Sequence, residues 1–519
     1  MTDYNSEEGH PRRWLILGVM CTSLVLVVAG VSSLNLALPS IRDALQPSNT
    51  ELLWIVDSYA LVFAGLLLPA GALGDRFGRK RMLLVGLTLF IIGALLATRS
   101  GGPLALIGSR SAMGVGAALI MPATLSIITV VFRRRERGKA IAIWAGFAGA
   151  GGALGVIAGG LLLQSFWWGS VFFINVPIAV AALVAVARIV PESKERERRP
   201  LDPVGSLLSI AGLGILLYAI IQGPESGWSS AIVLGGLAAA VALLGLFVWW
   251  ELRTEHPMLD PRYFRNRPFS LGSLTISASF MAMFGFFFIL TLFFQFAQGH
   301  SPLAAAVRTL PFAGTMIIVA PRSAGLAQRY GNRVMVTSGL LLSSAGLVMF
   351  GTVNVSTHYG IIAVLIVITA AGLAVLMPPS TAAIVSSLPQ DQAGVGSAVN
   401  DTTREVGGSL GIALLGSLLS SGYRTGIADS LAGLPNEAAD AARDSIGAAL
   451  AVAGQIGGDA GIRLAEAARL AYVDGMQLAF WAAAMVLAAT AAVIWRAYPR
   501  TLHKLAPEEA ERTRNVENQ

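Results

Sequence analysis

Long apolar runs separated by short polar connections make up most of the chain. A helix needs about 20 apolar residues to cross the roughly 30 Å hydrocarbon core of a bilayer. The runs lack the alternation of barrel strands, so we expect membrane-spanning helices. They fall at 14–38, 52–70, 82–98, 104–131, 139–163, 170–190, 204–222, 229–250, 269–296, 304–321, 334–353, 359–385, 395–422 and 476–495. The pattern predicts an all-α polytopic membrane protein with 14 transmembrane helices.

An internal similarity divides these runs into two halves. The segment Gly71–Arg81 (GALGDRFGRKR) follows the second run, and a weaker relative, 325–333 (GLAQRYGNR), follows the tenth. Parallel halves of this kind build one central cavity in many transporters. We therefore divide the chain into an N-terminal tail 1–13, a six-helix bundle 14–190, a linker with two inserted helices 191–268, a second six-helix bundle 269–495 and a C-terminal tail 496–519.

An alanine-rich segment, 423–475, separates the last two runs. Its two Ala-rich stretches, 436–453 and 460–472, are divided by Gly457-Gly458-Asp459, which favours a helical hairpin. It is either a solvated spacer or a lid that filters substrates.

Composition and charge agree with a membrane setting. Of the 519 residues, 55% are hydrophobic and 13% charged, and the mean hydropathy is +0.67, whereas soluble proteins are about 25% charged. The net charge of +7 does not indicate nucleic acid binding, because the basic residues cluster in alternate connections. The positive-inside rule then places both termini in the cytoplasm. The single cysteine, Cys21, allows no internal disulfide, and the first run is too long for a signal peptide.

The segment after the second run carries the most specific pattern in the chain. Its glycines allow close helix approach and a tight turn. Its aspartate can pair with a basic residue or cap the N-terminus of a neighbouring helix, and its basic residues hold the loop in the cytoplasm. A simple positively charged cluster is the alternative, but the spacing of glycine and aspartate favours a specific loop. The residues concerned are Gly71, Gly74, Asp75, Arg76, Gly78, Arg79 and Lys80.

This loop resembles the signature loop between helices 2 and 3 of the major facilitator superfamily. Three further elements match in order. Arg110–Gly116 resembles the family's R-x-x-Q-G-x-G, with Met in the Gln position, and Gly155, Gly159 and Gly160 resemble the antiporter element G-P-x-x-G-G, with Val in the Pro position. The elements around Trp54–Asp57 and 166–177 resemble the 14-helix branch of drug:proton antiporters, which exports quaternary ammonium compounds and dyes.

The resemblance covers essentially the whole chain and implies a function. It implies a proton-coupled secondary-active exporter of lipophilic drugs, dyes or related small molecules, and not an enzyme. Its partners would be the substrate, protons and the lipid bilayer, with no nucleic acid, and it would need no cofactor because the proton gradient supplies the energy. It would work as a monomer in the bacterial cytoplasmic (inner) membrane, with the loop at 71–80 as its conformational switch.

One position departs from the family. Gly30 stands where the first helix of relatives often has an acid, although Asn35 and Pro39 are kept. Because a divalent cation in a low-dielectric cavity needs well-placed carboxylates, we expect singly charged or neutral substrates to be exported better than divalent ones.

Ionisable residues inside the predicted spans are the candidates for proton coupling. Such residues cost about 2.5 kcal/mol or more at bilayer depth, so they should face a cavity or a partner. The alternatives are a solvated interfacial carboxylate for Asp57, a structural hydrogen-bonding role for Arg110, and a plain ion pair in the helix at 395–422. The candidates are Asp57, Arg110, Asp401, Arg404 and Glu405.

Aromatic and amide side chains are the candidates for the substrate cavity, because stacking and cation–π contacts suit flat or cationic ligands. They are Asn35, Trp54, Phe284 and Phe288. The phenylalanines of the span 269–296 go all round the helix, and plain packing is the alternative for them.

Other function classes receive less support. The same fold could export a lipid, a siderophore or a self-made antibiotic. A membrane enzyme is disfavoured, since the five histidines lie unclustered in tails and loops, and no P-loop is present. A channel or a non-transporting sensor remains a remote alternative.

Overall fold

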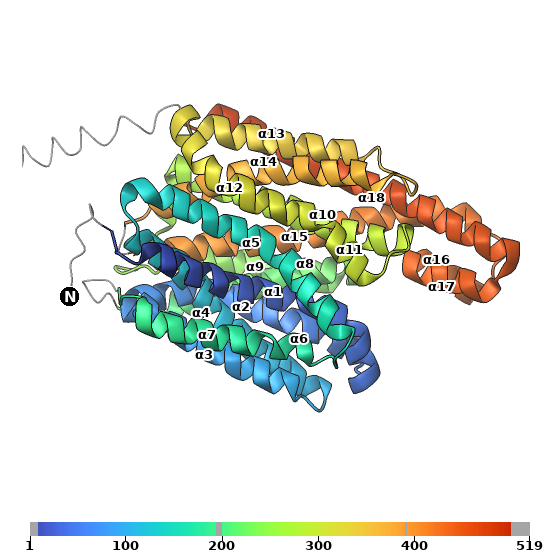
Figure 1. The fold of residues 1–519 in the computed structure, drawn as a ribbon, viewed down its shortest axis with the longest axis horizontal. Helices are drawn as coiled ribbons and strands as arrows, with labels where there is room; N and C mark the ends of the chain where they lie inside the picture. The colour runs from blue at the N-terminus through green and yellow to red at the C-terminus, as the bar shows by residue number, and fades with distance from the viewer. Residues whose placement is uncertain (1–8, 194–199, 390–391, 500–519) are drawn as a thin grey trace, which may run out of the picture.

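The computed structural model describes residues 9–193, 200–389 and 392–499. In these ranges, 14 helices are long and apolar enough to cross a membrane, which confirms the predicted number. They lie side by side along the long axis of the molecule (Figure 1). The predicted all-α membrane fold is therefore confirmed.

The first six spanning helices form a bundle with its own apolar core. They are α1 (Arg13–Leu45), α2 (Asn49–Phe77), α3 (Arg79–Thr98), α4 (Pro103–Val131), α5 (Arg134–Leu163) and the pair α6 (Ser170–Phe173) and α7 (Asn175–Ile189). Helix α4 packs against α2 and α3, and α1 packs against α5. Leu24, Leu87 and Met113 lie in the core of this bundle.

The last six spanning helices form a second core. They are α10 (Arg267–Leu292) with the π-helical turn η2 (Phe293–Ala297), α11 (Pro302–Arg308) with α12 (Leu310–Tyr330), α13 (Asn332–Phe350), α14 (Tyr359–Ser386), α15 (Ala393–Ile427) and α18 (Gly458–Ala497). Helix α15 packs against α10 and α18, and α13 packs against α14. The rings of Phe286, Phe350 and Phe480 meet at the centre of this core.

The two inserted helices lie on one side of both bundles. Helix α8 (Pro203–Ser226) packs against α9 (Ala231–Glu251) and also contacts α2 and α15, one helix from each bundle. Only 17% of the most apolar window of α9 is buried, so α9 presents most of its surface to lipid. The insert therefore adds α8 as a wall beside the junction of the two bundles.

The bundles meet along two helix pairs, α2 with α15 and α5 with α12. Small residues allow the close approach. A Cβ atom placed on Gly71 would lie 2.6 Å from the carbonyl oxygen of Gly394, and one on Gly146 would lie 3.1 Å from that of Met316. Both contacts would be crowded by any side chain.

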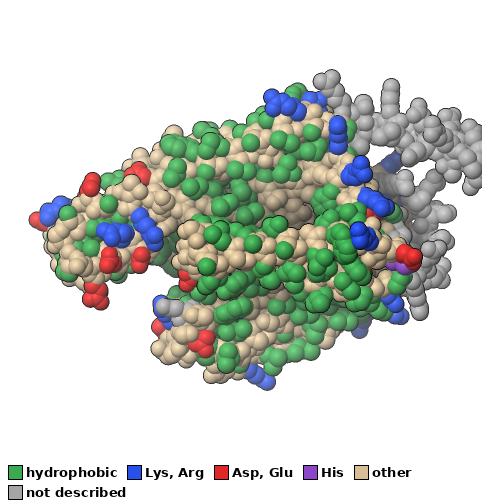
Figure 2. Space-filling model, turned by 180° about the vertical axis from the view of Figure 1, so that it is seen from behind, with side chains coloured by type: hydrophobic (Ala, Val, Ile, Leu, Met, Phe, Trp, Pro, Cys, Tyr) green, Lys and Arg blue, Asp and Glu red, His purple; other side chains and the backbone are tan. Residues whose placement is uncertain are grey.

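The two ends of the molecule differ in charge. Lys and Arg side chains gather at the end where the described chain begins, here called the basic end, and the opposite end carries the helices α16 (Asn436–Asp444) and α17 (Ile446–Ile456), here called the hairpin end (Figure 2). Helix α18 begins at Gly458, not near 476 as the apolar run indicated, because the Ala-rich segment continues the spanning helix outward. Helix α17 turns into α18 at Gly457, whose φ of +63° suits glycine.

The hairpin is tied to the second bundle by side chains as well as by the chain. The Tyr423 hydroxyl donates a hydrogen bond to the Ala442 carbonyl at 2.8 Å. Leu431, Ile446 and Leu464 are buried in a core that is continuous with that of the bundle. The segment 423–475 is therefore a folded extension of the second bundle.

Candidate functional site

At the basic end, Asp75 joins the two bundles. Its carboxylate accepts hydrogen bonds from the backbone N–H groups of Gly394 and Val395, at 2.9 and 3.1 Å, in the first turn of α15. It also accepts two from the guanidinium of Arg79, at 2.9 and 3.0 Å. Asp75 is 4% exposed and Arg79 is 3% exposed. A buried anion from one bundle thus caps the helix N-terminus of the other, where orphan N–H groups and the helix dipole both favour negative charge.

The rest of this loop positions the aspartate. Gly78 ends α2 with φ of +110°, a conformation that favours glycine. Lys80 donates to the carbonyl of Ala187 at 2.8 Å, which fastens the loop to α7. The Arg76 guanidinium lies 5.3 Å from the ring centroid of Phe77. At Gly74 a Cβ would meet no atom within 4 Å, so nothing in the structure requires glycine there.

Arg110 lies at the centre of the first bundle and is 1% exposed. Its Nε donates to the carbonyl of Ile55 at 3.2 Å, and Nη1 donates to that of Gly30 at 3.4 Å. The guanidinium sits 4.4 Å from the ring centroid of Tyr59. Arg110 therefore connects α4 to α1 and α2, and among the described residues no carboxylate forms an ion pair with it. The position that lacks the family's acid, Gly30, supplies a carbonyl oxygen instead.

A second buried charge cluster lies on α15. Asp401 is fully buried, and its Oδ1 accepts hydrogen bonds from Arg404 at 3.4 Å and from Asn400 at 3.2 Å. The guanidinium of Arg404 lies 4.5 Å from the ring centroid of Phe280 and 5.2 Å from that of Trp144, which belongs to α5 of the first bundle. The Oδ2 of Asp401 has no hydrogen-bond partner in the described structure. Only one oxygen of this carboxylate is hydrogen-bonded, although a buried charge without full pairing is costly.

Glu405 lies one turn further along α15 and interacts electrostatically with Arg404 and Asp401. Tyr59 of α2 is fully buried in the first bundle and lies within electrostatic range of both Arg110 and Glu405. The five predicted ionisable residues therefore form two groups, Asp401, Arg404 and Glu405 on α15, and Asp57 with Arg110 in the first bundle. Asp57 interacts electrostatically with Arg110, but its carboxylate lies in a separate cavity at the surface of the first bundle.

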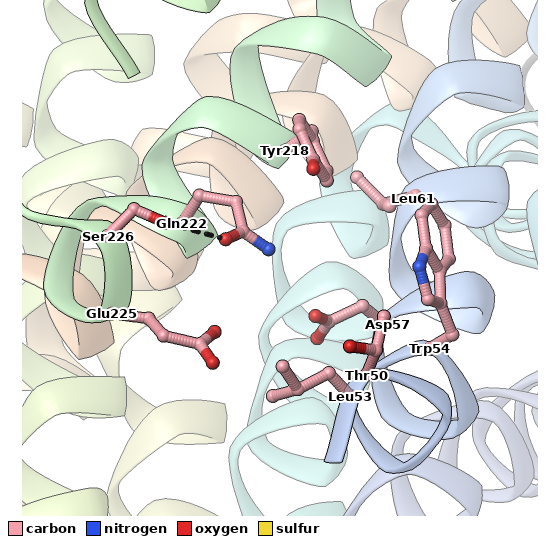
Figure 3. A pocket seen from close by; sticks show the side chains of 9 residues that line it. All are labelled: Thr50, Leu53, Trp54, Asp57, Leu61, Tyr218, Gln222, Glu225 and Ser226. Atoms are coloured by element: carbon pink, nitrogen blue, oxygen red, sulfur yellow. Dashed lines mark hydrogen bonds between the residues drawn. The ribbon is translucent and has the colours of Figure 1, made fainter. Parts of the chain in front are cut away.

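Asp57 lines a cavity of about 200 Å³ between α2 and the inserted helix α8. Figure 3 shows its carboxylate pointing into the cavity toward that of Glu225, on the last turn of α8. The rings of Trp54 and Tyr218 stack beside them, with centroids 6.1 Å apart and planes 19° apart. Gln222 lines the same space and accepts a hydrogen bond from Ser226 at 3.2 Å.

The predicted residues Trp54 and Asp57 thus meet three side chains that the sequence did not single out: Tyr218, Gln222 and Glu225. Glu225 was missed because the predicted span ended at 222, before a Gly-Pro pair, whereas α8 continues through Pro224 to Ser226. A usable signal was present, since the last turn of this apolar helix carries an amide, a carboxylate and a hydroxyl.

The other cavity candidates lie apart from this site. Phe284 packs against Phe280 and Gly408, and Phe288 packs near Gly416. Neither lines the cavity at Asp57, nor a second, apolar cavity of about 540 Å³ formed by α10, α15, α18 and Trp228. Asn35 lies in α1, and its side chain is outside the described part of the structure.

The glycines of the α5 element have a packing role. A Cβ on Gly155 would lie 2.6 Å from the Cα of Ala29, and one on Gly159 would lie 3.1 Å from the Cβ of Ser33. Both residues therefore allow α1 and α5 to cross closely. A Cβ on Gly160 would meet the side chain of Leu303 in the second bundle at 3.1 Å. The described residues include no group of three or more His, Cys, Asp or Glu placed to hold a metal ion.

Comparison with known proteins agrees with this architecture. The family description "Major Facilitator Superfamily" matches residues 20–212 and 202–412. The chain is 36% identical over 490 residues to the multidrug efflux pump LfrA of Mycolicibacterium smegmatis, covering 94% of this chain and 97% of the relative. It is 34% identical over 489 residues to the methyl viologen resistance protein SmvA of Salmonella typhimurium, covering 93% and 98%. The crystal structure of the human organic anion transporter MFSD10 shares the fold, with a TM-score of 0.60 at 14% identity and coverage of 93% and 100%.

Proposed function

The chain belongs to the major facilitator superfamily, and we propose that it is a proton-coupled secondary-active exporter of lipophilic drugs, dyes or related small molecules. Two relatives that match almost the whole chain are named for multidrug efflux and for resistance to methyl viologen. The 14 apolar helices and these bacterial relatives make it a multi-pass protein of a bacterial inner membrane. The energy source would be the proton gradient, and the working unit one chain.

The observation that carries the coupling is the buried cluster on α15. Asp401 has one unmet oxygen, its partner Arg404 contacts the aromatic face of Trp144 in the other bundle, and Glu405 lies beside them. A proton taken up by either acid reduces the negative charge that holds Arg404. Because Arg404 touches both bundles, a change in its pairing changes the contact between them. We assign proton coupling to this cluster together with Asp57 and Arg110.

We assign the conformational switch to the loop at 71–80, and the contacts of Asp75 support this assignment. They hold α2 against α15 at the basic end, and alternating access requires this contact to open and re-form. We propose that this end, with both termini, faces the cytoplasm, because the positive-inside rule favours its basic residues there. The cavity at Asp57 then lies near the outer face.

Transport by purified protein in liposomes tests the proposal. A lipophilic cationic dye is added outside the liposomes, and a pH gradient is imposed in one direction or the other. We expect dye movement against the proton flow, abolished by an uncoupler, and we expect Asp401→Asn to lose the response to the gradient. The exposed acid Glu466 provides the control, Glu466→Gln. Dye movement that ignores the gradient in the unmodified protein would exclude proton coupling.

A further inference from the structure

The cavity between α2 and α8 contains side chains that proton coupling alone does not explain. It brings two carboxylates, two stacked aromatic rings and an amide into one space of about 200 Å³. Three of these five side chains come from the insert, which belongs to neither six-helix bundle. Neither carboxylate forms a hydrogen bond or ion pair with another described residue.

The charges of the site can be counted. Glu225 and Asp57 interact electrostatically with each other, and Arg110 interacts with Asp57 from the interior of the first bundle. In their usual ionised forms these three groups leave one net negative charge. Arg110 donates to the carbonyls of Ile55 and Gly30, so it does not reach across to Glu225. One positive charge placed beside Glu225 would therefore neutralise the cavity.

The aromatic residues favour an organic cation over a hydrated metal ion. Trp54 lines the cavity and is 41% exposed, and Tyr218 stacks against it. Quaternary ammonium groups bind well to such faces, because their charge is diffuse and weakly hydrated. The lining of the cavity thus combines a fixed anion with an aromatic wall.

The size of the cavity limits the ligand. Sites for drug-sized molecules measure about 300–1,000 Å³, and this cavity is smaller. It can hold a single aromatic ring with its cationic group, or the charged end of a longer molecule. Glu225 is exposed at the end of α8, so such a ligand could enter without crossing the bundle.

We propose that this cavity is a binding site for small aromatic organic monocations, with Glu225 as the anionic residue and Trp54 and Tyr218 as the aromatic wall. The proposal rests on the export function proposed above, and it assigns substrate recognition to the inserted helix α8. Figure 3 shows the geometry, with Glu225 and Asp57 on opposite sides of the space that the cation would occupy.

Equilibrium binding to the full chain in lipid nanodiscs tests this site without any gradient. The probe is benzyltrimethylammonium, which has one ring and one charge, and binding is measured by calorimetry. We expect Glu225→Gln to weaken binding about tenfold, equivalent to about 1.4 kcal/mol. The control Glu466→Gln changes an exposed acid of α18 far from the cavity, and it should bind as the unmodified chain does.

A second pair of variants tests the aromatic wall. Tyr218→Leu should weaken binding severalfold, because it removes the ring that supports Trp54, whereas Tyr218→Phe keeps the ring and should bind normally. A bis-quaternary ligand, p-xylylene-bis(trimethylammonium), tests the charge count. It should bind no more tightly than the monocation, because the site has one net negative charge.

Several outcomes would overturn the assignment. Unchanged affinity in Glu225→Gln would exclude the site, and tighter binding of the bis-quaternary ligand by tenfold or more would exclude a preference for monocations. The nanodiscs are made of phosphatidylglycerol, which has no amine. If adding phosphatidylethanolamine abolishes binding of benzyltrimethylammonium, the amine headgroup of that lipid is the occupant of the cavity. If the unmodified protein binds benzyltrimethylammonium as expected but shows no proton-driven transport, only the proposed export function is contradicted.

Discussion

The substitution Asp75→Asn isolates the contact that closes the basic end. Asparagine has nearly the same shape, but it replaces one of the two acceptor oxygens by an N–H₂ donor and removes the charge. The carboxylate now takes two hydrogen bonds from Arg79 and one each from the N–H groups of Gly394 and Val395. Asparagine cannot accept all four, because one of its terminal atoms is a donor.

The magnitude follows from these contacts. Hydrogen bonds to a charged group contribute about 1.5–3 kcal/mol each, and removing one partner of a buried ion pair costs about 3–5 kcal/mol. Because asparagine keeps one acceptor, we take about 3 kcal/mol as the loss to the closed basic end. That is a shift of roughly 100-fold in the equilibrium between closed and open forms.

Distance measurements between spin labels detect this shift. Residues Arg135 on α5 and Gln328 on α12 are exposed, lie at the basic end and belong to different bundles. Both can carry labels on introduced cysteines after the single native cysteine, Cys21, has been replaced. We expect the Asp75→Asn variant to show a longer, broader distance distribution, slower transport and unchanged equilibrium binding of substrate.

The matched control is Asp459→Asn, which changes an exposed aspartate at the start of α18. It should leave the distance distribution and the transport rate as they are. A distribution in Asp75→Asn identical to that of the unmodified chain would refute the reasoning, since the four hydrogen bonds would then contribute nothing to closure. Binding lost in parallel with transport would show that Asp75 serves the substrate site instead.

Three further predictions follow from other contacts. Gly71→Ala should loosen the basic end and slow transport, because its Cβ would lie 2.6 Å from the Gly394 oxygen. Gly74→Ala should leave both unchanged, since no atom lies within 4 Å of its Cβ. The same spin-label distances check both variants. Asp57→Asn should abolish proton-driven efflux while folded protein stays in the membrane, and an efflux profile over pH equal to that of the unmodified chain would contradict this. Replacing 430–470 by a short Gly/Ser bridge should leave a folded chain with a lower Tm in detergent, because the bundle keeps its own core; complete loss of protein from the membrane would show that the hairpin is required for folding.

Hydropathy alone was sufficient to predict the membrane fold. The need to satisfy every backbone group within lipid makes each apolar run a helix, so the number of helices follows from counting runs. The ends of the helices were less predictable where a helix continues into water. Alanine and charged residues extend α18 from Gly458 through a segment with no apolar run, because helix propensity and packing replace hydropathy there.

The sequence singled out some residues of the candidate site, such as Asp57 and Asp75, but not their contacts. Asp75 could be identified as a capping or pairing residue, yet its partners Gly394 and Val395 lie more than 300 positions away and carry no recognisable side chain. Backbone N–H groups are present at every helix start, so the sequence does not distinguish the one that binds. Glu225 could not be paired with Asp57 for a related reason, since the packing of an inserted helix against α2 depends on tertiary structure.

The 40-residue helix α18 extends the second bundle far beyond the lipid. At 1.5 Å per residue it is about 60 Å long, and next to its inner end Tyr498 accepts a hydrogen bond from Asn332 at 3.4 Å. A continuous helix behaves as a stiff rod, so the hairpin at its outer end moves with the whole bundle. With the proposed orientation this rod emerges on the outer face of the inner membrane. An antibody that binds the hairpin and the outer face of the first bundle at the same time would therefore hold the exporter in one conformation without entering the membrane.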